Sequence, residues 1–394
     1  MDPRVNRRQF LTTSATAAAG LSLPWTAGSA GAQGNAAIPA TTPPTFKTKL
    51  QKAVILGGQP TEERLREIKS AGFDGIEYSG VLAQEQALET RKLVEKTGLR
   101  VHSVLRGWAA FNSAVPEQVQ SSYVRCEDAL RTAQWLGADA VLMVTCQVPV
   151  PAFNPGGGRG RGDAAATPGR GTAPPAAPAR GTAAGDTPQA GARRGGGGGG
   201  GRGSGLPFRM PDPWEFHIDF DERTGHIKSV VYGDNAPYAE YIRLHNHATD
   251  TSRAWTRKLI PLAEKTKVLV TIENVWNNLW VEPKIFAHFV RTFNNRWVKA
   301  YYDIGNNIKW APPEEWVLSL GDLLAKVHVK DYLLDPASPT GNGNWAQIRE
   351  GSTRWPIVRA ALDRVNYNGW LTIEGSSLAL EEQAKRLDMI MAGV

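Results

Sequence analysis

Four acidic or imidazole side chains stand at the ends of successive short apolar segments in the second half of the chain. They are Glu273, Asp303, His328 and Glu374. Three carboxylates at one point would repel one another unless a cation lay between them. Oxygen ligands with one nitrogen suit Mn²⁺, Mg²⁺ or Co²⁺, with Zn²⁺ also possible. The sequence therefore predicts a site for one divalent metal ion, with Mn²⁺ as the first expectation.

A repeated pattern predicts the elements that position these four residues. A helical stretch, a glycine and a short apolar strand follow one another, as in residues 123–136, Gly137 and residues 140–145. Eight strands are predicted, at residues 53–56, 75–78, 100–105, 140–145, 267–272, 299–302, 326–329 and 370–373. Eight alternating units predict an α/β fold, a closed (β/α)8 TIM barrel with its active site at the carboxyl ends of the strands. The alternative is an open doubly wound sheet, but no glycine-rich phosphate loop follows the first strand.

A long excursion interrupts this pattern after the fourth strand. Residues 151–206 consist almost entirely of Gly, Ala, Pro and Arg, a composition that predicts a disordered insert. Residues 207–234 follow as a β-hairpin excursion, with alternating segments on both sides of a turn at 221–225. The barrel itself is then expected at residues 49–150 and 235–392. The hairpin leaves the barrel at the catalytic face, so it is either a lid over the site or a contact in a homo-oligomer.

The first 32 residues resemble a twin-arginine export signal. Arg7 and Arg8 precede Phe-Leu, a weakly apolar stretch and an Ala-Gly-Ala cleavage pattern that ends at Ala32. A linker at residues 33–48 would join this leader to the barrel. We therefore expect recognition by the twin-arginine export machinery, a periplasmic or other extracytoplasmic location, and no membrane attachment after the signal is removed.

The net charge argues against a nucleic-acid partner. The formal charge is +7, but the leader contributes +2 and the insert +5, so the remaining residues are neutral. Binding to nucleic acid depends on clustered Lys and Arg on the body of a domain. The two cysteines, Cys126 and Cys146, are interpreted as buried small apolar residues.

With these residues in place, the chain resembles the sugar phosphate isomerase/epimerase superfamily, the xylose-isomerase-like TIM barrels. The resemblance covers roughly residues 50–150 and 235–392 and rests on Glu273, Asp303, His328 and Glu374. It implies that all four hold one divalent metal and that Glu273 and Glu374 act as the acid/base pair. The metal would bind the carbonyl and hydroxyl oxygens of a carbohydrate, and the reaction would pass through an enediolate.

Two positions depart from the ketose 3-epimerases of that superfamily. Asn306 replaces a histidine after the metal Asp, and Lys330-Asp331 replaces an arginine after the metal His. His-x-Lys-Asp is similar to keto-inositol dehydratases of the same superfamily, so Lys330 would be a catalytic acid or a donor to the carbonyl. The equally weighted alternative is a salt bridge between Lys330 and Asp331 at the rim.

The candidate substrate-binding residues are Glu77, Arg106, Trp108, Trp276 and Asn306. Aromatic faces and polar side chains of this kind suit a small carbohydrate. The sequence thus predicts an exported metal-dependent isomerase or epimerase of a keto-sugar or polyol. The first alternative is a lyase or dehydratase that acts on a keto-inositol or 3-keto-glycoside. The second is a barrel that binds a sugar or metal without catalysis.

Overall fold

The computed structural model describes residues 45–149, 206–335, 337–338 and 342–394. The predicted leader at 1–32 and nearly all of the predicted insert at 151–206 lie outside the described residues. Among the helices that are described, none combines the length and apolar character needed to cross a membrane.

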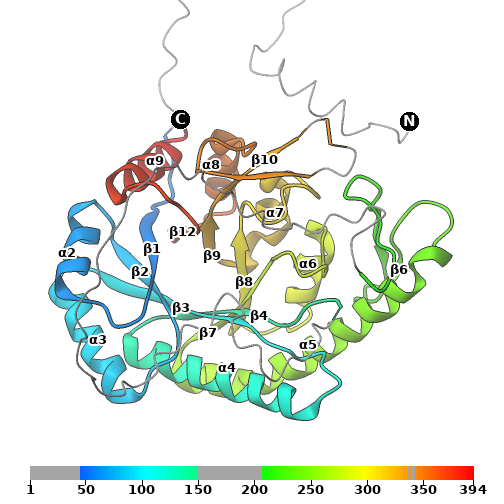
Figure 1. Ribbon diagram of the computed structural model, residues 1–394, viewed down its shortest axis with the longest axis horizontal. Helices are drawn as coiled ribbons and strands as arrows, with labels where there is room; N and C mark the ends of the chain where they lie inside the picture. Colours follow the sequence, from blue (N-terminus) through cyan, green and yellow to red (C-terminus); the bar gives the residue numbers. More distant parts are fainter. Residues whose placement is uncertain (1–44, 150–205, 336, 339–341) are drawn as a thin grey trace, which may run out of the picture.

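Eight parallel strands close into a barrel, which confirms the predicted (β/α)8 architecture (Figure 1). The strands are β1 (Gln51–Gly57), β2 (Gly75–Ser79), β3 (Arg100–Trp108), β4 (Ala140–Val144), β7 (Leu269–Glu273), β8 (Val298–Asp303), β9 (Leu324–Val329) and β12 (Trp370–Ile373). They follow one another around the barrel in chain order, and β12 pairs with β1 to close it. Closure places all eight carboxyl ends at one rim.

Helices surround the strands and cover their outward-facing apolar residues (Figure 1). They are α2 (Glu62–Ser70), α3 (Gln84–Lys96), α4 (Pro116–Leu136), α5 (Ala239–Thr266), α6 (Pro283–Arg291), α7 (Pro313–Leu320), α8 (Trp355–Arg364) and α9 (Leu380–Ala392), with short 3₁₀ turns at Ala236–Tyr238 and Gly321–Leu323. Gly137 ends α4 with a φ of 76°, the left-handed conformation that lets the chain turn directly into β4. Both cysteines are free and buried, as predicted.

Side chains that point into the barrel fill its interior in layers. Leu142, Val144, Val275 and Tyr301 form an apolar cluster there. Gly75 gives Trp370 its space, because a Cβ at this position would lie 2.7 Å from the indole ring and 2.5 Å from the Arg100 carbonyl oxygen. On β9 the inward positions are Lys326 and His328, so the strand presents a lysine near the amino end and the imidazole near the carboxyl rim.

The predicted hairpin of the excursion is present but shorter than expected. Its strands are β5 (Asp219–Phe220) and β6 (Ile227–Ser229). Beyond them, the two arms are joined by a bond from the His217 amide to the Val230 carbonyl oxygen (2.8 Å) and one from the Asp221 amide to the His226 carbonyl oxygen (2.9 Å). The Asn246 amide side chain on α5 binds both the Ile227 N–H (2.7 Å) and the Ile227 carbonyl (3.0 Å). One α5 side chain therefore satisfies both backbone groups on the outer edge of β6.

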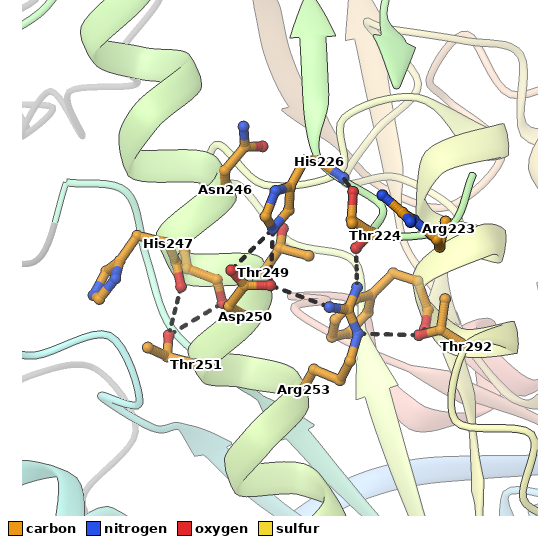
Figure 2. A network of polar contacts seen from close by, with 12 residues as sticks. Arg223, Thr224, His226, Asn246, His247, Thr249, Asp250, Thr251, Arg253 and Thr292 are labelled. Atoms are coloured by element: carbon orange, nitrogen blue, oxygen red, sulfur yellow. Dashed lines mark hydrogen bonds and ion pairs between the residues drawn. The ribbon is translucent and has the colours of Figure 1, made fainter. Parts of the chain in front are cut away.

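A polar network fastens this hairpin to α5 (Figure 2). His226 Nε2 lies 2.8 and 2.9 Å from the two Asp250 carboxylate oxygens. Arg253 contacts Asp250 at 3.2 Å and donates to the Thr224 carbonyl oxygen at 2.6 Å. The hairpin thus packs on α5, the helix that follows it in the chain, and lies outside the ring of strands (Figure 1).

A second hairpin, which the sequence analysis did not predict, follows the strand that carries His328. It pairs β10 (Asp331–Leu334) with β11 (Gly343–Ala346). The segment between them contains two prolines and is longer than the two-residue turns that identify a hairpin from sequence. This hairpin begins at the carboxyl rim and contributes to the site described below.

Candidate metal centre

The barrel brings together all four side chains that the sequence analysis singled out. Each of Glu273, Asp303, His328 and Glu374 offers one ligand atom, and these atoms all lie within 4.8 Å of one another. Asp303 and His328 are register partners on neighbouring strands, and Glu273 ends the strand on the other side of β8. The first three side chains are buried, whereas Glu374 remains partly exposed, so the cluster opens toward solvent on the Glu374 side.

The carboxylates gather around one nitrogen of His328. Its Nδ1 lies 2.9 Å from Glu374 Oε2, 3.2 Å from Glu273 Oε1 and 3.9 Å from Asp303 Oδ2. Asp303 Oδ2 and Glu374 Oε2 are buried, and within the described residues both face the Lys330 ammonium. One nitrogen and three carboxylate oxygens that converge on one point are a donor set that fits a divalent cation.

Glu77 holds the opposite edge of the same imidazole. Glu77 Oε2 lies 2.6 Å from His328 Nε2, and the Glu77 side chain is wholly buried. Burial opposes protonation of His328, but the carboxylates of Glu77 and Glu374 outweigh it and raise the pKa well above its usual value. A carboxylate that keeps the proton on Nε2 leaves Nδ1 facing the other acids, the arrangement that orients metal-binding histidines. Glu77 thus lies behind the imidazole, away from the substrate wall where we expected it.

Lys330 points into the cluster. Its Nζ lies 3.0 Å from Glu374 Oε2 and 3.2 Å from Asp303 Oδ2. Burial opposes its charge, but Asp303 and Glu374 outweigh burial and raise the Lys330 pKa. Of the two roles considered from the sequence, the salt bridge to Asp331 is absent among the described contacts. The ammonium is therefore placed where it can meet a bound molecule.

Burial and charge act in opposite directions on the three acids. Burial raises the pKa of Glu273 and raises that of Asp303 strongly. Burial would also raise the pKa of Glu374, but Lys330 and His328 outweigh it and hold that pKa well below its usual range. The protein's own cations therefore compensate only part of the negative charge. Binding of a divalent cation would complete the compensation and release protons from the cluster.

The family model described as xylose isomerase-like TIM barrel matches residues 65–168 and 213–390. The chain belongs to this family. No curated protein sequence matches the chain significantly.

Solved structures share the barrel at low sequence identity. The apo 3-keto-D-glucoside 4-epimerase from E. coli has a TM-score of 0.53 and 14% identity, covering 87% of this chain and 99% of its own. A xylose isomerase domain protein from Planctomyces limnophilus has a TM-score of 0.53 and 13% identity, covering 88% and 97%. A D-allulose 3-epimerase from Methylomonas sp. has a TM-score of 0.51 and 15% identity, covering 89% and 99%. At these identities the likeness establishes the fold alone.

In this xylose isomerase-like barrel, Asp331 anchors the rim hairpin. Its carboxylate accepts from the Tyr332, Arg349 and Thr353 amides and from the Trp355 indole, at 3.0, 3.0, 3.2 and 3.0 Å. Gly351 leaves room for these bonds, since a Cβ there would lie 2.1 Å from Asp331 Oδ1. Lys330 thus points toward the candidate metal centre, and the adjacent Asp331 points to the opposite side of the backbone, where it binds the loop.

Asn306 supports Asp303, one of the four metal-binding candidates. Its backbone N–H donates to Asp303 Oδ1 at 2.7 Å, and its side chain donates to the Asn274 carbonyl oxygen at 2.9 Å. Asn274, which sequence reasoning missed although it follows Glu273 directly, brackets the Asp303 backbone with bonds of 2.8 and 3.0 Å. The Trp276 indole N–H donates to the Asn306 carbonyl. Asn306 is nearly fully buried, so it positions the ligand loop beneath Trp276.

The two candidates on β3 lie apart from this cluster. The Arg106 guanidinium donates to the Trp108 carbonyl oxygen and, at 3.4 Å, to the Ser122 carbonyl oxygen on α4. Leu105, the preceding residue, is the one that packs on the interior apolar cluster. The contact with Ser122 shows that Arg106 faces the helix layer. Trp108 is 42% exposed at the end of β3, and the structure shows no contact between it and the four metal-binding candidates.

A buried lysine beside Trp276 also escaped the sequence analysis. Lys309 is 3% exposed, and its Nζ lies 4.0 Å from the Trp276 ring centroid and 4.2 Å from that of Trp310. No ion pair to Lys309 occurs among the described residues, and burial lowers its pKa to about 8. The pattern of apolar residues around Lys309 does not predict that its ammonium lies against two indole rings.

Replacing Glu77 tests its role as the support of His328. We expect Glu77→Gln to weaken Mn²⁺ binding about 10–100-fold, because a neutral amide no longer orients the His328 ring through a charged hydrogen bond to Nε2. Isothermal titration of the EDTA-stripped protein measures this affinity. The matched control is Asp139→Asn. Asp139 pairs at 2.6 Å with Lys326, which is on the same strand as His328 but at the other end of the barrel. Equal affinities for wild type and Glu77→Gln would contradict the assigned role.

Lys309 should give stability a measurable pH dependence. Its pKa is about 8 when folded against 10.5 normally, so between these values the unfolded chain binds more protons and stability rises with pH. At 1.36 kcal/mol per pKa unit, the rise is up to about 3 kcal/mol. We expect Lys309→Met to lack this increment in denaturant unfolding at pH 7 and pH 10.5. The exposed Lys265→Met is the control, and identical pH profiles for wild type and Lys309→Met would refute the prediction.

Proposed function

We propose that this protein catalyses divalent-metal-dependent proton transfer at the carbon next to the carbonyl of a keto-sugar or related polyol, as a sugar isomerase or epimerase. The convergence of Glu273, Asp303, His328 and Glu374 within 4.8 Å at the carboxyl rim carries the proposal. Solved structures that share the barrel include proteins named as keto-sugar epimerases, which supports the same reaction class.

The four residues would hold one cation, with Mn²⁺ as the first candidate and Mg²⁺, Co²⁺ or Zn²⁺ as alternatives. When bound, a divalent ion supplies Lewis-acid stabilisation of the negative charge that develops on the enediolate oxygens. Glu77 keeps the His328 ring in the orientation that turns Nδ1 toward this position. Asn306 and Asn274 fix Asp303 through its carboxylate and its backbone.

Glu273 and Glu374 are the proposed acid/base pair. Both approach the same point, because Glu273 Oε1 and Glu374 Oε2 lie 3.2 and 2.9 Å from His328 Nδ1. One glutamate removes the proton from the carbon next to the carbonyl, and the other returns a proton to the enediolate. Return to the opposite face of the same carbon gives the epimer, and return to the neighbouring carbon gives the isomer.

The position of Lys330 favours one second candidate, a lyase or dehydratase. Its Nζ faces the cluster at 3.0 Å from Glu374 Oε2. After a glutamate removes the proton, Lys330 would protonate the β-oxygen as the carbon–oxygen bond breaks, so that water or an alcohol leaves and a carbon–carbon double bond forms. Both reactions begin with the same proton abstraction, and their products separate them.

The experiment is deuterium incorporation from D₂O into free ketoses and 3-keto-glycosides, with EDTA or with added Mn²⁺. We expect exchange next to the carbonyl that needs the metal, and loss of about 10²–10⁴-fold in rate for Glu374→Gln. Metal content is measured for both proteins, so that loss of the ion is not mistaken for loss of the base. Absence of exchange in every substrate, with metal bound, would instead favour a barrel that binds sugar or metal without catalysis.

Export through the twin-arginine pathway to the periplasm or another extracytoplasmic compartment is also part of the proposal. It rests on Arg7, Arg8 and the Ala30-Gly31-Ala32 pattern, which lie outside the described residues. A mature amino terminus near Gln33 in secreted material would support it. An extracytoplasmic location favours free or glycosidic sugars over phosphorylated ones as substrates.

A further inference from the structure

Three aromatic rings from separate segments meet at the mouth of the metal centre, and we call them the indole platform: Trp276, Tyr332 and Trp345. The two indoles stack with centroids 5.0 Å apart and planes at 28°. Tyr332 stands nearly perpendicular to both, at 5.5 and 5.1 Å. Tyr332 is buried, but Trp345 is 49% exposed, so part of this indole remains accessible to solvent.

The platform begins one side chain away from the metal-binding candidates. Lys330 Nζ lies 5.0 Å from the Trp345 ring centroid, and the same atom lies 3.0 Å from Glu374 Oε2. At the other indole, the Trp276 N–H donates to the carbonyl of Asn306, whose N–H binds Asp303. A molecule held at the metal centre therefore has the platform as its neighbour.

Contacts behind the platform hold it in place before any ligand arrives. The Lys309 ammonium lies 4.0 Å from the Trp276 ring centroid. The Gly343 N–H donates to the Tyr332 hydroxyl at 2.7 Å, which joins the two strands of the rim hairpin. Because these rings are already ordered, a ligand that stacks on Trp345 loses little affinity to ordering of the protein.

Polar groups follow the exposed indole closely in the chain. Gln347, two residues after Trp345, donates to the Ser377 hydroxyl at 2.7 Å and accepts from the Ser376 hydroxyl at 2.9 Å. These serines follow Glu374 in the chain, so the amide bridges the rim hairpin and the loop after β12. An aromatic face beside amide and hydroxyl groups matches a sugar ring, which presents C–H groups on its faces and hydroxyls around its edge.

Exposure alone does not distinguish Trp345. Trp214 is 42% exposed on the excursion, yet the described chain gives it no ring contact. Trp345 is as open to solvent but is stacked, braced from behind and adjacent to the metal centre. This combination indicates a surface built to receive a ligand.

We infer that the indole platform is a second sugar-binding subsite, which stacks on the ring joined by a glycosidic bond to the keto-sugar at the metal centre. The substrate is then a glycoside or disaccharide, with the reacting ring at the metal and the second ring on Trp345. This inference rests on the proposed function and adds the substrate class to it.

The test uses Trp345→Ala, Trp345→Phe and, as the matched control, Trp214→Ala, each with its melting temperature recorded. Binding of cellobiose and of glucose is measured by isothermal titration, which needs no turnover. A stacking contact of about 1.4 kcal/mol predicts about tenfold weaker cellobiose binding for Trp345→Ala. Trp345→Phe should stay within about threefold of wild type, since it keeps an aromatic face. The ratio of kcat/KM for a 3-keto-disaccharide to that for its 3-keto-monosaccharide should fall by about the same tenfold in Trp345→Ala.

Cellobiose affinity that does not change in Trp345→Ala would overturn the subsite. An equal loss for cellobiose and glucose would also overturn it, because Trp345 would then act on the ring at the metal centre. Cellobiose binding that depends on Trp345 without exchange in any keto-sugar would sustain the subsite and refute the proposed function. Exchange of keto-sugars, together with cellobiose binding that does not depend on Trp345, would sustain the proposed function and refute the subsite.

Discussion

Mutual repulsion among buried carboxylates is the constraint on which the site depends. The candidate ligand atoms of Glu273, Asp303, His328 and Glu374 lie within 4.8 Å of one another. Glu77 adds a fourth carboxylate behind the imidazole. The protein supplies only His328 and Lys330 as cations in contact with these groups within its described part. A further cation would therefore favour the ionised form of all three acids. Under the proposed function, the same ion would stabilise the enediolate of a keto-sugar.

The rest of the rim keeps this cluster in shape. Asp331 receives four hydrogen-bond donors from the loop behind it, which leaves Lys330 on the opposite side of the backbone facing the ligands. Asn274 and Asn306 bind Asp303 from two directions, and Trp276 closes over Asn306. Ligand positions fixed in this way lose little entropy on binding a metal or substrate.

The sequence predicted the barrel and the four residues of the candidate metal site because both follow from local patterns. Strand length, glycine after helices and an acid or imidazole at four of the strand ends are properties of short segments. The support for His328 could not be found in this way, since Glu77 is 251 positions away in the chain and only barrel closure joins them. The rim hairpin escaped for a different reason, because the connection between its strands is longer than the two-residue turns that identify a hairpin from sequence. The direction of the Arg106 side chain could not be predicted from alternation along the strand. An irregularity in the β3–β4 register falls between Leu105 and Gly107.

We propose that four strand ends hold one divalent cation through one imidazole nitrogen. Electron spin-echo spectroscopy of the protein titrated with Mn²⁺, after removal of bound metal, tests this site. We expect one Mn²⁺ per chain, with modulation from a single histidine nitrogen that disappears in His328→Gln. A stoichiometry other than one, or a nitrogen signal that persists in His328→Gln, would contradict it.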